Sequence, residues 1–238
     1  MDQTNPTTSK TVSMGGTACK NESAVVPSTP PSESFSKILI VAGPSGVGKS
    51  TVIKKIMECI PNTFAFSVSH TTRQPRPGEV DGINYHFTTK EVMEQLISED
   101  KFIEQCDVHG NMYGTSKMEI ERLNSENKIA VLDIDIQGCQ KIKKRHDVLQ
   151  MNPVYIRIKI AYEELEKRLT GRGTETPESL KIRLDNAKAE LEPMPGFFNL
   201  EVENQVVEDC AKELVSFLET VGVLGLQEDG SSHATCIK

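Results

Sequence analysis

A glycine-rich stretch directly after an apolar run restricts the fold of this chain more than any other feature. Residues 43–50 read GPSGVGKS and match the pattern G-x-x-x-x-G-K-S/T, and residues 38–42, ILIVA, have the composition of a buried strand. Residues 51–57 are predicted to continue as an amphipathic helix. A chance match in a polar loop is the alternative, but the order of strand, loop and helix favours a phosphate-binding loop (P-loop).

Such a loop works because its glycines let the backbone N–H groups surround phosphates at a helix N-terminus. Lys49 would reach the outer phosphates, and Ser50 would offer a hydroxyl to Mg²⁺. The sequence therefore predicts that the chain binds a nucleoside triphosphate.

Strand-like apolar runs alternate with helix-like stretches, which is typical of an α/β fold with a largely parallel sheet. The predicted core strands are 38–42, 64–68, 129–134, 154–160 and 200–203. The predicted helices are 50–59, 89–99, 116–127, 163–171, 177–191 and 208–221. Residues 69–115 contain several glycines and short strand-like pieces, so they are predicted to form an inserted antiparallel or mixed subdomain beside the P-loop.

Both ends of the chain differ in composition from the middle. Residues 1–36 are rich in Ser, Thr, Pro and Asn and are predicted to form a disordered tail. A transit peptide is the alternative, but this stretch has no Arg, carries acidic residues and lacks the apolar region of a secretory signal. Residues 227–238 are predicted to form a polar tail, and Cys236 lies too close to the end for a prenylation motif.

Composition limits the partners and the compartment. The net charge of −7 argues against a protein that gains affinity by neutralising a nucleic-acid backbone, and no apolar run is long enough to span a membrane. The six cysteines show no short repeated spacing, which favours a reducing cytosol over a disulfide framework or a cysteine metal site. We expect a cytoplasmic monomer that binds neither nucleic acid nor membranes.

Two arginines three residues apart form a second candidate site. Arg73 and Arg76 lie in the segment 69–79, where Pro75 and Pro77 restrict the backbone between and after them. Arginine suits planar, two-point recognition of phosphate. Two arginines in a Pro/Gly loop are more often solvated surface, so their neighbours in the sequence must decide.

These arginines belong to a longer pattern, S-H-T-T-R-x-x-R-x-x-E-x-x-G-x-x-Y-x-F over residues 69–87. Together with the P-loop, this pattern closely resembles the signature of the guanylate kinase family. The resemblance continues through residues 102–104, 110–115, 132–138, 167–176 and 183–184, and it covers residues 37–222. It implies a P-loop NTPase-type core (37–68, 126–160 and 184–226), a GMP-binding subdomain (69–125) and a short helical lid (161–183).

The resemblance also implies an activity and the residues that perform it. The activity is transfer of the γ-phosphoryl group of ATP to GMP, and also to dGMP, with Mg²⁺ as cofactor. The residues implied to bind ATP are Gly43, Pro44, Ser45, Gly46, Val47, Gly48, Lys49, Ser50, Thr51 and Asn204. Those implied to bind GMP are Ser69, Arg73, Arg76, Glu79, Tyr85, Glu104, Tyr113, Thr115, Asp133 and Asp135. Those implied to be catalytic are Lys49, Arg76, Arg168, Arg172 and Arg183.

Each assignment has a physical rationale. Glu104 can accept hydrogen bonds from guanine N1–H and the 2-amino group, a pair of donors that adenine lacks, so Glu104 is the predicted base reader. Asp133 and Asp135, at the end of an apolar strand, are expected near GMP and the water shell of Mg²⁺, whose direct protein ligand would be Ser50. Arg168 and Arg172 are four apart and are expected to share a helix face, with Gly171 beside them allowing a lid to bend.

Three other functions compete with this interpretation. A catalytically inactive guanylate-kinase-like interaction module is the alternative from another class, but residues 43–50 and all three lid arginines are intact. A kinase for another nucleoside monophosphate is opposed by Glu104 and Ser69. A P-loop GTPase or motor is opposed by the absence of an N-K-x-D sequence.

Overall fold

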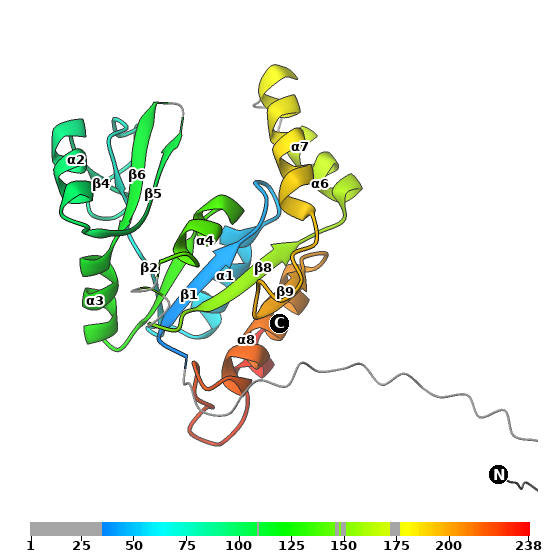
Figure 1. The fold of residues 1–238 in the computed structure, drawn as a ribbon. Helices are drawn as coiled ribbons and strands as arrows, with labels where there is room; N and C mark the ends of the chain where they lie inside the picture. Colours follow the sequence, from blue (N-terminus) through cyan, green and yellow to red (C-terminus); the bar gives the residue numbers. More distant parts are fainter. Residues whose placement is uncertain (1–34, 109, 146–147, 149–150, 172–176) are drawn as a thin grey trace, which may run out of the picture. The chain divides into compact units, whose positions relative to one another are not determined.

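The computed structural model describes residues 35–108, 110–145, 148, 151–171 and 177–238. They lie within a compact unit of residues 33–238 (Figure 1). The predicted tail over residues 1–36 falls almost wholly outside the described residues. Of its last two residues, Phe35 packs against the core.

A five-stranded parallel sheet forms the core, in the order β2-β7-β1-β8-β9. Its strands are β1 (Ile38–Ala42), β2 (Phe64–Phe66), β7 (Ile129–Asp133), β8 (Val154–Lys159) and β9 (Leu200–Glu203). The predicted parallel sheet is confirmed, and each of its strands overlaps a predicted one. β1 is central, so the loop that follows it lies between the ends of β7 and β8.

The sheet is buried on both faces because successive residues of its apolar strands point to opposite sides. Leu39 and Val41 belong to one hydrophobic cluster, and Ile38 and Ile40 belong to the other. The helices α1 (Lys49–Cys59), α6 (Tyr162–Thr170), α7 (Pro177–Leu191) and α8 (Val207–Thr220) contribute to the first cluster. The helices α3 (Lys117–Ser125) and α4 (Ile136–Ile142) contribute to the second.

Helix α4 is a helix of the sheet core that the sequence analysis did not predict. It has only seven residues, which is too short for a clear periodic pattern. Its apolar residues Ile136, Cys139 and Ile142 nevertheless recur every three positions and are buried. Asp135 caps its N-terminus by accepting a hydrogen bond from Gly138 N at 2.6 Å.

A second, smaller sheet has the order β4-β3-β6-β5. Its strands are β3 (His70–Thr71), β4 (His86–Phe87), β5 (Phe102–Val108) and β6 (Asn111–Ser116), and helix α2 (Lys90–Ser98) comes between β4 and β5 in the chain. The pair β3/β4 is parallel, whereas β3/β6 and β5/β6 are antiparallel. The predicted mixed insertion is therefore present.

The C-terminal segment is packed, which differs from the polar tail predicted over residues 227–238. A 3₁₀ helix, η1 (His233–Cys236), lies against α8. Glu219 of α8 accepts hydrogen bonds from Ser232 Oγ at 2.5 Å and from His233 N at 2.7 Å, and Ile237 is only 2 % exposed. One apolar side chain and one buried acceptor thus fix a segment whose composition is polar.

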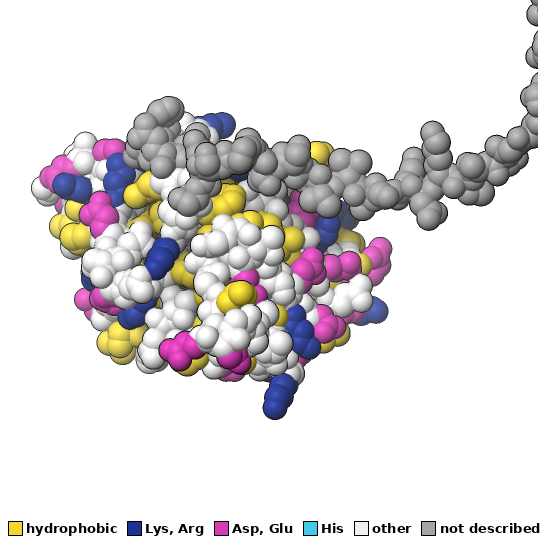
Figure 2. All heavy atoms as spheres, turned by 90° about the horizontal axis from the view of Figure 1, so that it is seen from below, with side chains coloured by type: hydrophobic (Ala, Val, Ile, Leu, Met, Phe, Trp, Pro, Cys, Tyr) yellow, Lys and Arg dark blue, Asp and Glu magenta, His cyan; other side chains and the backbone are white. Residues whose placement is uncertain are grey.

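Among the described residues, no helix is both long enough and apolar enough to span a membrane. On the face shown in Figure 2, acidic and basic side chains are interspersed around apolar ones.

Candidate functional site

The P-loop is bent by three glycines with positive φ, at Gly43 (142°), Gly46 (89°) and Gly48 (95°). Positive φ is costly for residues with a Cβ atom. Space is also missing, because a Cβ on Gly43 would lie 2.1 Å from the Ile158 carbonyl oxygen, and one on Gly48 would lie 2.4 Å from Asn204 Nδ2. Strand β8 and the end of β9 therefore hold the loop in shape from behind.

Lys49 begins α1 and folds back over the loop. Its Nζ donates to the Gly43 carbonyl at 2.7 Å and lies 3.6 Å from Asp133 Oδ1 at the end of β7. Ser50 and Thr51 follow in the first turn of α1 and are exposed. The described partners of Lys49 are two backbone carbonyls and one carboxylate, which an incoming phosphate could replace.

Asn204, directly after β9, supports the loop from the other side. It is fully buried, and its Nδ2 donates to the Val47 carbonyl at 2.7 Å. Arg168 of α6 donates to the Asn204 carbonyl at 3.1 Å and to the Val47 carbonyl at 3.5 Å. Asn204 and Arg168, both predicted site residues, are thus joined to the P-loop by hydrogen bonds.

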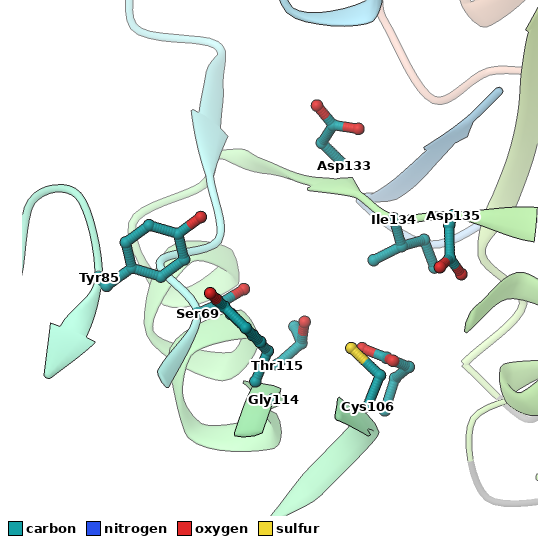
Figure 3. Close-up of a pocket in the computed structure, with 10 residues that line it drawn as sticks. Ser69, Tyr85, Cys106, Gly114, Thr115, Asp133, Ile134 and Asp135 are labelled. Carbon is teal, nitrogen blue, oxygen red and sulfur yellow. The ribbon is translucent and has the colours of Figure 1, made fainter. Parts of the chain in front are cut away.

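A cavity of about 280 Å³ lies between the two sheets (Figure 3). The predicted site residues that line it are Ser69, Tyr85, Glu104, Tyr113, Thr115, Asp133 and Asp135. Strand alternation explains the lining from β5 and β6, because Glu104 pairs with Thr115 and Cys106 pairs with Tyr113 on one face. A register shift between Phe102 and Glu104 adjusts how that face meets the cavity.

Glu104 has an unusual electrostatic environment. Its side chain is 7 % exposed, and burial together with the negative charge of Asp135 raises its pKa from 4.5 to about 7. The charge of Lys141 and the Cys106 thiol oppose that shift without cancelling it. A buried carboxyl of this kind gains from a ligand that supplies hydrogen-bond donors.

Asp133 and Asp135 reach the cavity from the end of β7 (Figure 3). Burial raises the pKa of Asp133, and the positive charge of Lys49 opposes this shift. Asp135 is tied to the start of α4 by the bond from Gly138. Asp133 therefore contacts Lys49 of the P-loop and also lines the cavity, whereas Asp135 is held as the N-cap of α4.

Arg73 and Glu79 form a two-point ion pair beside the cavity, with nitrogen–oxygen distances of 2.9 and 2.8 Å. The hydrogen bond to Glu79, followed by one with Tyr113, raises the pKa of Arg73. The guanidinium also lies 5.3 Å from the centre of the Tyr85 ring. Glu79 accepts from the Arg76 backbone N–H at 2.7 Å, and the Arg76 side chain is exposed.

The other two predicted lid arginines are Arg183 and Arg172. Arg183 lies half-buried on α7. Arg172 lies outside the described residues, and α6 ends before it, at Thr170. The helix face that Arg168 and Arg172 were expected to share therefore stays a prediction.

A second cavity, of about 440 Å³, lies beside Arg168. It is lined by Ile160, Ala161, Glu164, Arg168, Gln205 and Val206. These residues follow the carboxyl ends of β8 and β9, which is where α/β sheets bind ligands.

The sequence analysis missed three residues of the first cavity, Cys106, Gly114 and Ile134. Cys106 could have been found from its spacing, since it lies two positions after Glu104 on a strand and so shares its face. Ile134 lies between the two predicted aspartates, where no chemical signal marks it.

Both the sequence and the fold of this chain are similar to those of known proteins. A family model described as guanylate kinase matches residues 35–221. The chain is 46 % identical to guanylate kinase of Schizosaccharomyces pombe over 75 % of this chain and 88 % of that protein. It is 45 % identical to guanylate kinase 1 of Oryza sativa subsp. japonica over 76 % of this chain and 47 % of that protein.

The match to guanylate kinase 1 of Arabidopsis thaliana is similar, at 43 % identity over 85 % of this chain and 50 % of that protein. The chain therefore spans about half the length of these two plant relatives. The solved structure of guanylate kinase from Anaplasma phagocytophilum is similar in fold, with a TM-score of 0.58, 28 % identity, and coverage of 79 % of this chain and 87 % of that one.

Proposed function

The chain belongs to the guanylate kinase family, and from that premise we propose that it transfers the γ-phosphoryl group of ATP to GMP, giving ADP and GDP. dGMP is a second acceptor under this proposal, because no residue of the site visibly requires a 2′-hydroxyl. The observation that carries the proposal is the position of Asp133, which lines the inter-sheet cavity and lies 3.6 Å from Lys49 of the P-loop. A nucleotide in the cavity and a triphosphate on the loop would meet there.

Guanine is the base that suits the cavity. Glu104 supplies two acceptor oxygens, and the Ser69 and Thr115 hydroxyls lie on the same lining. A base without two adjacent donors would leave the Glu104 carboxylate buried and unmatched, which is a strong basis for discrimination. This supports GMP over AMP, CMP or UMP.

The phosphate of GMP would be held by Arg73, Arg76, Tyr85 and Tyr113. The Arg73 guanidinium has five N–H donors, and two of its hydrogen bonds go to Glu79. Its remaining donors could bind phosphate while Glu79 keeps the guanidinium oriented. Glu79 would thus act through Arg73, which refines its predicted place among the GMP-binding residues. The exposed Arg76 side chain can turn toward the same phosphate.

ATP would bind with its phosphates on residues 43–51 and its base in the cavity beside Arg168, close to Asn204. Among the described residues, no three His, Cys, Asp or Glu side chains could hold a metal ion by themselves. The exposed Ser50 and the 35 % exposed Asp133 side chain fit Mg²⁺, which usually keeps several waters and leans on substrate oxygens. When bound, Mg²⁺ would neutralise charge on the phosphate oxygens; Ser50 would hold it directly, and Asp133 and Asp135 through water.

The transfer step needs positioning and charge stabilisation more than a protein base. An oxygen of the GMP phosphate is already anionic and attacks the γ-phosphorus, while the bond to the β-phosphate oxygen of ATP breaks. Lys49 and Arg76 would stabilise the transferring group, together with Arg168, Arg172 and Arg183 of the lid segment 161–183. Closure of that segment and of residues 69–125 would exclude water as a competing acceptor.

The proposal is tested by ADP formation from ATP and Mg²⁺ with GMP, dGMP, AMP, CMP and UMP in parallel. We expect turnover with GMP and dGMP that collapses in Lys49→Met and, for GMP, in Glu104→Gln. Turnover with AMP, CMP or UMP instead would identify another monophosphate kinase. Absence of turnover with every acceptor, in folded protein, would favour the inactive interaction module.

We also propose that the protein acts in the cytoplasm as a monomer. Cys59, Cys106, Cys139, Cys210 and Cys236 are free thiols, which suits a reducing compartment. Cell fractionation and the mass in solution would test these two points.

A further inference from the structure

One side chain of the inter-sheet cavity has no part in the mechanism above. Cys106 lies two residues after Glu104 on β5, and both side chains point from the same face of the strand. Figure 3 shows the Cys106 sulfur directed into the cavity. Its partner across the sheet is Tyr113, and that of Glu104 is Thr115, so the thiol is built into the wall that faces the base.

The thiol is placed to donate to the Glu104 carboxyl. Both residues line the cavity, and the Cys106 thiol lowers the pKa of Glu104, as a donor to its carboxylate would. Burial, followed by the nearby charge of Glu104, raises the pKa of Cys106 to about 12, so the thiol keeps its proton at neutral pH. The S–H group is therefore the donor and the carboxylate oxygen the acceptor.

Within the part of the chain that the structure describes, few other contacts orient the Glu104 carboxyl group. The nearby cation, Lys141, donates its hydrogen bond to the Gln105 carbonyl at 3.3 Å. Asp135, the nearby anion, can only repel the carboxylate. The terminal torsion of a glutamate side chain is broad, so without a donor the plane of the carboxylate is poorly defined.

We propose that Cys106 is a positioning residue that determines specificity, because its S–H holds the Glu104 carboxylate in the orientation that accepts both guanine N1–H and the 2-amino group. This inference rests on the proposed function. A carboxylate has about four acceptor sites, so it can accept from the thiol and from both donors of the base together. The chemical class recognised is a purine with adjacent ring N–H and exocyclic amino donors.

The test compares Cys106→Ala, which removes the donor, with Cys106→Ser, which keeps one. Cys139→Ala is the matched control, since Cys139 is a fully buried thiol of the second hydrophobic cluster. For each protein, KM for GMP, KM for ATP, kcat and the ratio of kcat/KM for GMP over IMP are measured. IMP keeps the N1–H of guanine but lacks the 2-amino group.

We expect Cys106→Ala to raise KM for GMP about 3- to 10-fold, the effect of one weak hydrogen bond to a charged group, with kcat and KM for ATP unchanged. The preference for GMP over IMP should fall, because the two-point contact depends more on orientation than a one-point contact does. Cys106→Ser should lie within about 2-fold of wild type. Thermal unfolding confirms that each variant is folded.

Two results would overturn the inference. One is a Cys106→Ala protein with the wild-type KM for GMP and the wild-type GMP preference. The other is Cys106→Ser impaired as much as Cys106→Ala, since that would make side-chain shape the cause rather than the donor. Calorimetric titration with GMP separates this inference from the proposed function: wild type that binds GMP without turnover contradicts only the activity, and the variants are then compared by Kd.

Discussion

Lys49 Nζ lies 3.6 Å from Asp133 Oδ1, so the ammonium that follows β1 is paired with the carboxylate that ends β7. The two strands are adjacent and parallel, and their carboxyl ends therefore meet at one edge of the sheet. This pair joins the P-loop to the inter-sheet cavity, and each half of the proposed reaction depends on it.

Replacing Lys49 by methionine should lower kcat/KM for GMP roughly 100- to 1000-fold, because a positive group aimed at the transferring phosphoryl is lost. The fold should persist, since Lys49 contacts carbonyls at the rim of the loop. Steady-state kinetics and circular dichroism check both parts. Lys55→Met on the same helix, which removes only an ion pair with Glu208 at 3.5 Å, should leave the activity unchanged; equal losses in the two variants would contradict the assigned role of Lys49.

Replacing Glu104 by glutamine should make the protein more stable at about pH 8 while abolishing its preference for GMP. The pKa of Glu104 is raised from 4.5 to about 7, so the folded state binds this proton more tightly than the unfolded state. The free energy of unfolding of wild type therefore falls as pH rises between these two values, and ionisation costs about 3 kcal/mol above them. Glutamine cannot ionise and avoids that cost.

Denaturant unfolding at about pH 5 and pH 8 measures the effect on Glu104→Gln. The stability gain should be present at the higher pH and small at the lower one. Glu121→Gln, an exposed position on α3, should show neither. A gain of equal size at both pH values would rule out ionisation as the cause.

Replacing Gly43 by alanine should destabilise the fold by more than about 3 kcal/mol, because positive φ and a clash with backbone act together. The new Cβ would lie 2.1 Å from the Ile158 carbonyl oxygen, which is part of β8 and cannot turn away. Gly222→Ala measures the destabilisation caused by positive φ alone, since Gly222 has φ of 74° and no atom lies within 4 Å of an added Cβ. Chemical denaturation should give about 1 kcal/mol for it; similar losses in both variants would show that the Ile158 contact is relieved.

Replacing Arg157 by methionine should lower the free energy of unfolding by about 3 to 5 kcal/mol, the range for removing one partner of a buried ion pair. Arg157 is 1 % exposed, lies 3.6 Å from Glu201, and donates to the carbonyls of Glu190 and Glu192 at the end of α7. The Lys159 side chain is the other cation beside Glu201 and is 43 % exposed. Lys159→Met should therefore lower the free energy of unfolding by less than about 1 kcal/mol. Thermal or urea unfolding compares the two, and equal losses would place the stabilisation in Glu201 alone.

Much of the fold follows from local patterns in the sequence. The apolar runs at β1, β7 and β8 and the motif at residues 43–50 predict strand, loop and helix because burial on both faces and the φ values of glycine leave few other conformations. β9 and α8 are likewise predicted from local periodicity. α4 was not predicted because seven residues are too few for a periodic signal. η1 was not predicted because its packing depends on contacts with Glu219 and on the burial of Ile237, which its polar composition does not indicate.

The order of amino acids is enough to identify the groups available for chemistry: a P-loop, arginines for phosphate, and Glu104, Asp133 and Asp135 as acidic side chains. Which of these groups contact one another is set by the folded arrangement. Arg73 is held by Glu79, Asn204 supports the loop through Val47, and Cys106 joins Glu104 on the wall of the cavity. Strand register and burial set these contacts and pKa shifts, and both depend on residues far apart in the chain.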